Sequence, residues 1–120
     1  MKRAMSLAVA ASLLAGAAAP ALAEGWSITK LGSLATEQAC MDKARMVINR
    51  YLFAHAGGSI GADAWSLYAY DLEPGLQDVV IVCPIGGGGA VNPMLVVQSE
   101  SSDSDRAWVA NELVSIWESN

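Results

Sequence analysis

The chain has 120 residues and a formal net charge of −5 at pH 7, with 12 acidic residues against 7 basic ones. An acidic surface repels nucleic acid and anionic lipid, so we expect neither as a partner of the folded domain.

The first 23 residues have the three parts of a secretory signal peptide. Lys2 and Arg3 form a basic start, an Ala/Leu/Val-rich run extends to about Ala19, and the small-x-small sequence Ala-Leu-Ala ends at Ala23. This pattern predicts that residues 1–23 are removed and that residues 24–120 form one small domain, periplasmic or secreted. The alternative is an uncleaved membrane anchor, for which the run is barely long enough.

A strand and a long helix are predicted first. Trp26–Leu31 alternates roughly as a strand does. Thr36 then caps a helix from about Glu37 to Ala56, which ends before two glycines. Helical spacing gives this helix one apolar stripe, suited to lie on a sheet: Cys40, Ala44, Val47, Ile48, Tyr51, Leu52 and His55.

The second half predicts a loop, three strands and a helix. The loop is Gly57–Asp63, and the elements after it are strands at Ala64–Tyr70, Val79–Cys83 and Met94–Gln98 and a helix at Arg106–Glu118. Glu73-Pro74-Gly75 is a turn. The unbroken apolar run Val79–Cys83 predicts a central strand buried on both faces.

The element order is therefore β-α-β-β-β-α. Two successive hairpins predict a mostly antiparallel sheet of about four strands. With both helices packed on one face, the fold class is an α+β two-layer sandwich.

Cys40 and Cys83 are the only cysteines, and an exported chain favours a disulfide between them. Simple crossovers would place them at opposite edges of the sheet. A bridge therefore requires Gly57–Asp63 to carry the chain back across the sheet, with the second strand antiparallel to the first. Without a bridge, both cysteines are buried small hydrophobes.

Catalytic signatures are weak. No Cys-x-x-Cys is present, and the only histidine, His55, lies far along the helix from Cys40, where packing near the helix end explains it. Gly86–Gly89 lacks the Lys-Ser/Thr of a phosphate loop and is predicted to be a flexible hairpin loop. The basic residues of the domain suit a solvated surface: Lys30, Lys43, Arg45, Arg50 and Arg106.

The acidic cluster Glu100, Asp103 and Asp105 precedes a helix, where capping explains it, although carboxylates also bind hard cations. We predict no cofactor and no metal. The alternative function is an enzyme or metal-binding protein that uses this cluster or a cysteine.

Aromatic residues in one strand point to binding. Alternation sends Trp65 to one face of the sheet and Tyr68 and Tyr70 to the other, and an uncovered face would expose an aromatic surface. The sequence thus favours a small exported, non-catalytic binding or interaction domain. Its partner would be a protein or a small molecule.

Overall fold

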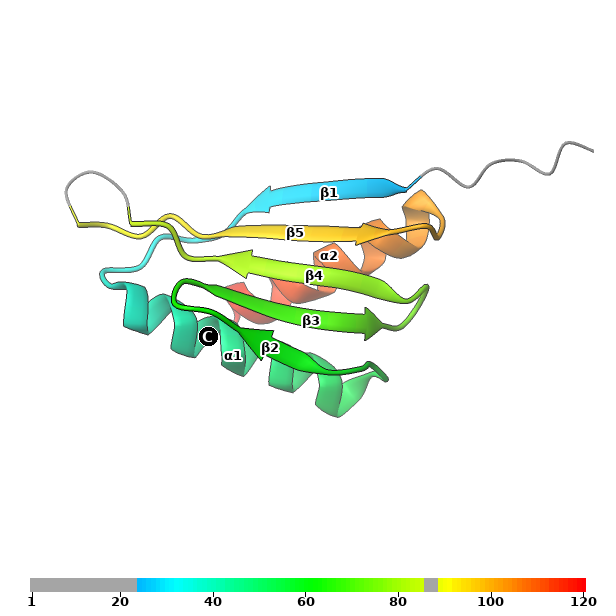
Figure 1. Cartoon of the computed structure of the whole chain (residues 1–120), viewed down its shortest axis with the longest axis horizontal. Coiled ribbons are helices and arrows are strands. Elements are labelled where there is room, and N and C mark those ends of the chain that lie inside the picture. The colour runs from blue at the N-terminus through cyan, green and yellow to red at the C-terminus, as the bar shows by residue number, and fades with distance from the viewer. Residues whose placement is uncertain (1–23, 86–88) are drawn as a thin grey trace, which may run out of the picture.

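Five strands form one antiparallel sheet in the computed structural model, which describes residues 24–85 and 89–120. The strands are β1 (Gly25–Lys30), β2 (Ile60–Ala62), β3 (Ser66–Leu72), β4 (Gln77–Val82) and β5 (Met94–Ser99), and the helices are α1 (Glu37–Ala54) and α2 (Asp103–Glu118). Across the sheet the order is β1-β5-β4-β3-β2 (Figure 1). The predicted α+β sandwich is confirmed, with one strand more than expected. The predicted signal peptide and most of the predicted glycine loop, residues 86–88, lie outside the described residues.

Both helices lie on one face of the sheet, behind it in Figure 1. Helix α1 packs against β3, and α2 packs against β1, β5 and α1. Thr36 begins α1, because its hydroxyl oxygen accepts the backbone N–H of Ala39 at 3.1 Å. The predicted apolar stripe supplies the buried face of α1: Cys40, Ala44, Val47, Ile48 and Tyr51.

Strand β4 is central, as predicted, but it is buried on one face only. Val79 and Ile81 point to the helices and are buried, whereas Val80 and Val82 are partly exposed. The expectation of burial on both faces is therefore wrong. The apolar run reflects a second face that is apolar and uncovered by any described helix, rather than a second helical layer.

The predicted loop Gly57–Asp63 contains the short strand β2, which pairs with β3 at the edge of the sheet. Backbone bonds from Gly58 N–H to the Tyr70 carbonyl and from Tyr70 N–H to the Ser59 carbonyl extend this pairing. Only three residues form the strand, and two of them are small, so the sequence carries little strand signal there. The segment returns the chain along the sheet and makes β3 antiparallel to β1 in direction.

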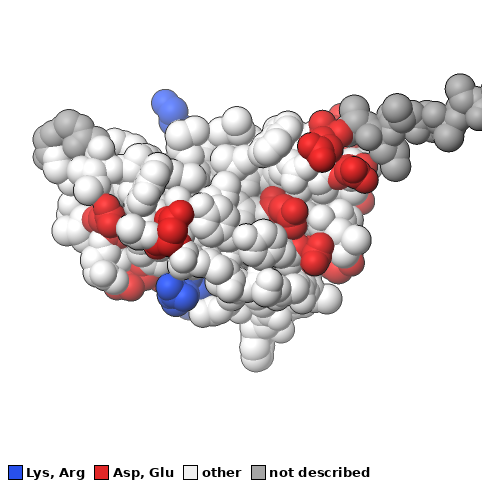
Figure 2. All heavy atoms as spheres, viewed as in Figure 1, with Lys and Arg blue, Asp and Glu red and all other residues white. Residues whose placement is uncertain are grey.

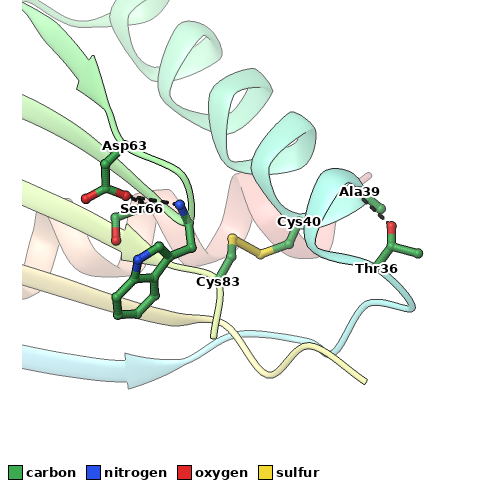
Figure 3. The surroundings of a disulfide bond; sticks show 7 residues. Thr36, Ala39, Cys40, Asp63, Ser66 and Cys83 are labelled. Carbon is green, nitrogen blue, oxygen red and sulfur yellow. Dashed lines mark hydrogen bonds between the residues drawn. A yellow bond between two sulfur atoms is a disulfide. The ribbon is translucent and has the colours of Figure 1, made fainter. Parts of the chain in front are cut away.

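This return makes the Cys40–Cys83 disulfide possible, and the bridge is present (Figure 3). Cys40 lies in the first turns of α1 and Cys83 directly follows β4, with 6.0 Å between their Cα atoms. The predicted bridge and the topology that it requires are both confirmed. Within the described ranges, no helix is long and apolar enough to cross a membrane.

Arg106 departs from its predicted place on a solvated surface. Its side chain is buried where α2 crosses the ends of β1 and β5. The guanidinium donates to the backbone carbonyls of Ser99 and Ser101 and pairs with the Asp103 carboxylate. These partners stabilise a buried charge that would otherwise destabilise the fold.

Candidate functional site

The candidate site is the face of the sheet opposite the helices, here called the open face. Strand pairing aligns four of its side chains in one row, because Ile28 pairs with Val96, Val96 with Val80, and Val80 with Tyr68. In the next row, Trp26 pairs with Gln98. Trp26 and Ile28 are 64% and 62% exposed, so large apolar side chains here meet water.

A hollow of about 180 Å³ lies within this face. The residues that line it are mostly aromatic or β-branched: Trp26, Tyr68, Tyr70, Asp78, Val79, Val80, Val96 and Gln98. Four adjacent strands, β1, β5, β4 and β3, contribute residues to the hollow. The site therefore depends on the assembled sheet. Rigid aromatic rings around an apolar floor suit the burial of an apolar group, with few polar atoms to orient it.

Asp63 orients Tyr68 from the turn before β3. One carboxylate oxygen accepts the backbone N–H groups of Trp65 and Ser66, at 3.0 and 2.8 Å (Figure 3). The other accepts the Tyr68 hydroxyl at 2.9 Å. The backbone bond from Trp65 and the bond from Tyr68 lower the pKa of Asp63. The same carboxylate raises the pKa of Tyr68, chiefly through the hydrogen bond. Tyr68 is thus held as a neutral phenol with a fixed ring direction.

A β-bulge at Asp71 returns Leu72 to the core directly after Tyr70 on the open face. Pairing shifts by one residue between Ala69 and Leu72, and Asp71 has a φ of 56°. Strict alternation would send Tyr70 and Leu72 to the same face. Because of the extra residue, Leu72 returns to the core while Tyr70 stays exposed.

The three aromatic residues predicted as a binding surface do not all meet. Tyr68 and Tyr70 line the hollow, but Trp65 precedes β3, is 50% exposed and is not among the lining residues. Trp26 lies there instead, and it was not predicted. Its signal in the sequence is the alternation of Trp26 and Ile28 in the first strand, which places both on one face.

Charge around the open face is mostly acidic. In Figure 2, viewed from the sheet side, uncharged surface lies between groups of acidic side chains, and few basic ones are visible. Asp78 is the charged residue that lines the hollow. It also lines an adjoining hollow of about 510 Å³ with Glu24 and Glu100. The site therefore favours cationic or neutral groups over anionic ones.

The other candidate chemistries are not gathered into a site. Asp103 pairs with Arg106, while Glu100 lines the adjoining hollow. Among the described residues, no group of three or more His, Cys, Asp and Glu side chains is arranged to hold a metal ion. His55 caps α1 and contacts Trp108 and Glu112 of α2. Both cysteines are in the disulfide, so neither offers a free thiol.

Comparison with known proteins found no match for this chain. The chain matches no protein-family model, and no curated protein or solved structure matches it either. Function is therefore inferred from the open face itself, which can bury an apolar group between aromatic rings.

Proposed function

We propose that the protein is a small, exported, non-catalytic binding domain whose open face receives an apolar segment of a protein partner. One observation supports this above the others. Two tyrosines, a tryptophan and valines surround a hollow of about 180 Å³ on the face that no described helix covers. Aromatic residues dominate the energetics of protein interfaces because they bury much area with few rotatable bonds.

Charge narrows the kind of partner. The chain is acidic overall, and Asp78 lies at the wall of the hollow. A segment with an apolar side chain beside a lysine or arginine would match both features. The apolar residue would enter between Tyr68 and Tyr70, and the basic residue would lie near Asp78.

Export is supported by two independent features. The sequence of residues 1–23 has the parts of a signal peptide, and the Cys40–Cys83 disulfide suits an oxidising compartment. If the chain is exported and processed, N-terminal sequencing of the protein from its native source begins at Glu24. Soluble protein that retains Met1 would contradict export.

Selection from a displayed peptide library tests the binding function. We expect peptides that combine apolar and basic residues, and we expect Tyr70→Ser to weaken their binding by at least about tenfold. Phe53→Ser is the matched control, because Phe53 is an aromatic residue of α1, 95% exposed, on the helical layer. Equal effects of the two substitutions, or a selection without any such peptide, would contradict the proposal.

A further inference from the structure

We infer that two copies of this protein pair through the outer edges of their β1 strands and form one continuous antiparallel sheet. This inference goes beyond the binding function and does not depend on it. Its basis is the sequence of β1 with the residue before it, Glu24-Gly25-Trp26-Ser27-Ile28-Thr29-Lys30, which complements itself when two copies run antiparallel.

Strand β1 presents a free edge. In the described part of the chain its one strand neighbour is β5. The strand has six residues, twice the three of β2 at the opposite edge. Edge strands of soluble proteins are commonly protected by proline, bulges, charged side chains or short length. Strand β1 has one of these features, the exposed Lys30 at its last position, and the exposed side chains at its centre are Trp26 and Ile28.

Backbone groups of alternate residues are available at this edge. Leu31, just after β1, donates its N–H to the Pro93 carbonyl at 2.9 Å, on the side of β5. Because these directions alternate along a strand, Ser27 and Thr29 also turn their backbone groups toward β5. Trp26, Ile28 and Lys30 therefore turn theirs outward, where another strand can bond to them.

The side chains of β1 favour one register. With a two-fold axis at Ser27, Trp26 lies opposite the partner's Ile28, and the outward groups of these two residues face each other. An aromatic side chain opposite a β-branched one is a favourable cross-strand pair. At the ends, the Glu24 carboxylate lies opposite the partner's Lys30, so opposite charges meet twice in the dimer. When residues 1–23 are removed, the α-ammonium group of Glu24 lies beside this pair and reduces the attraction. Such a self-complementary patch is what a two-fold interface requires.

Helix α2 leaves room for this arrangement. It packs beneath β1 and β5, and Trp108 and Glu112 contact His55 of α1. The side of α2 away from that contact carries Ala107, Asn111 and Val114 along its middle and the acidic residues Asp103 and Glu118 at its two ends. Around the axis the two α2 helices run antiparallel, with the uncharged residues at the middle of the contact and the acidic residues at its ends.

The dimer also changes the open face. Side chains at even positions of β1 lie on this face in both copies, so Trp26 and Ile28 of each copy adjoin those of the other. The apolar surface then continues across the axis instead of ending at an edge. A partner copy thus extends the candidate site.

Charge exchange tests the register in protein produced and processed by an exporting host, with mass measured by analytical ultracentrifugation. We expect the wild type to be a dimer. Glu24→Lys and Lys30→Glu each place like charges opposite each other twice, so each should raise the dimer dissociation constant about tenfold. The double variant restores both attractions and should dimerise as the wild type does. A mixture of the two single variants should form heterodimers.

Cross-linking gives a second measurement. In this register Ser27 faces the partner's Ser27 at about 4.5 Å between Cα atoms, within disulfide range. Ser27→Cys should therefore give a covalent dimer on a non-reducing gel. Thr29→Cys is the matched control. In this register the cysteine at position 29 lies four residues along the strand from the partner's cysteine at position 29, so the two should not be linked. If the wild-type protein is monomeric at every concentration measured, the inference is overturned. A dimer that neither charge variant weakens, and that the Ser27→Cys substitution does not link covalently, would overturn it equally.

Discussion

Tyr51 of α1 donates a hydrogen bond to the backbone carbonyl of Glu73, in the turn between β3 and β4. The disulfide joins the start of α1 to the opposite end of β4. The helix is therefore fastened near both of its ends to the same hairpin, once covalently and once by a hydrogen bond. Each attachment gives a prediction.

The Tyr51 attachment predicts a loss of stability in alkali. Burial raises the pKa of Tyr51 to about 12, and the carboxylates of Glu112 and Glu73 act in the same direction. Because the folded pKa lies above the ordinary tyrosine value of 10.0, this stabilisation is complete below about pH 10 and is lost as pH rises toward 12. Tyr51→Phe should lower the free energy of unfolding by about 1 kcal/mol at pH 7. The difference between wild type and variant should then shrink between pH 10 and 12, measured by urea denaturation. A difference that stays constant would contradict the prediction.

The disulfide predicts a large entropic contribution to stability. Its cysteines are 43 residues apart, and a loop of this size contributes about 4 kcal/mol in the chain-entropy model. The Cys40→Ala/Cys83→Ala double variant should lose most of this free energy of unfolding. Adding a reductant should destabilise the wild type and leave the double variant unchanged. A decrease of less than about 1 kcal/mol in the free energy of unfolding would show that the disulfide contributes little to the stability of the fold.

The hydrogen bond between Asp63 and Tyr68 predicts a coupled titration. The lowered pKa of Asp63 means that its stabilising bonds persist above its ordinary pKa and are lost as pH falls through the lowered one. Tyr68→Phe should raise the pKa of Asp63, measured by carbon NMR of the carboxyl group. The pKa should remain below the ordinary value, because the backbone N–H bond from Trp65 is the larger cause. Tyr70→Phe is the control. An unchanged Asp63 pKa in the Tyr68→Phe variant would contradict the coupling.

Close packing at the start of β1 leaves no space for a side chain at Gly25. A Cβ atom there would overlap the guanidinium of Arg106, which is itself buried. Gly25→Ala should displace the bonds of Arg106 to the Ser99 and Ser101 carbonyls and lower the free energy of unfolding by roughly 1–3 kcal/mol. Gly61→Ala in β2 is the control, because its Cβ would meet only Tyr70, at 4.0 Å. Equal stability of the two variants would show that Arg106 moves aside without cost.

The sequence predicted the elements with strong periodic signals. The apolar stripe and the Thr36 cap identified α1, and the disulfide required the direction of β3 that the structure has. Strand β2 was missed because three residues with two small side chains give no alternation. The burial of Arg106 was missed because its carbonyl partners come from the backbone, which a side-chain pattern does not reveal.

The candidate site was predicted in part for a similar reason. Alternation placed Tyr68 and Tyr70 on one face, and both line the hollow. It did not bring Trp26 to them, because that contact depends on the order of strands across the sheet and not on their order in the chain. Strand β5 brings Trp26 near, since it lies between β1 and β4. The one-residue bulge at Asp71 is also invisible in the apolar pattern, although it decides which face Leu72 occupies.

The pairing of β1 with β5 has a consequence for the order in which the molecule is made. Gly25 pairs with Ser99, so the first strand synthesised has no sheet partner until most of the domain exists. At synthesis rates of about 5–20 residues per second this delay lasts roughly 4–15 s. During that time Trp26 and Ile28 belong to a strand without a sheet. A nascent chain of this protein therefore carries its most exposed apolar strand unpaired for longer than any other. After the predicted signal peptide, β1 is the next apolar segment that a chaperone would meet.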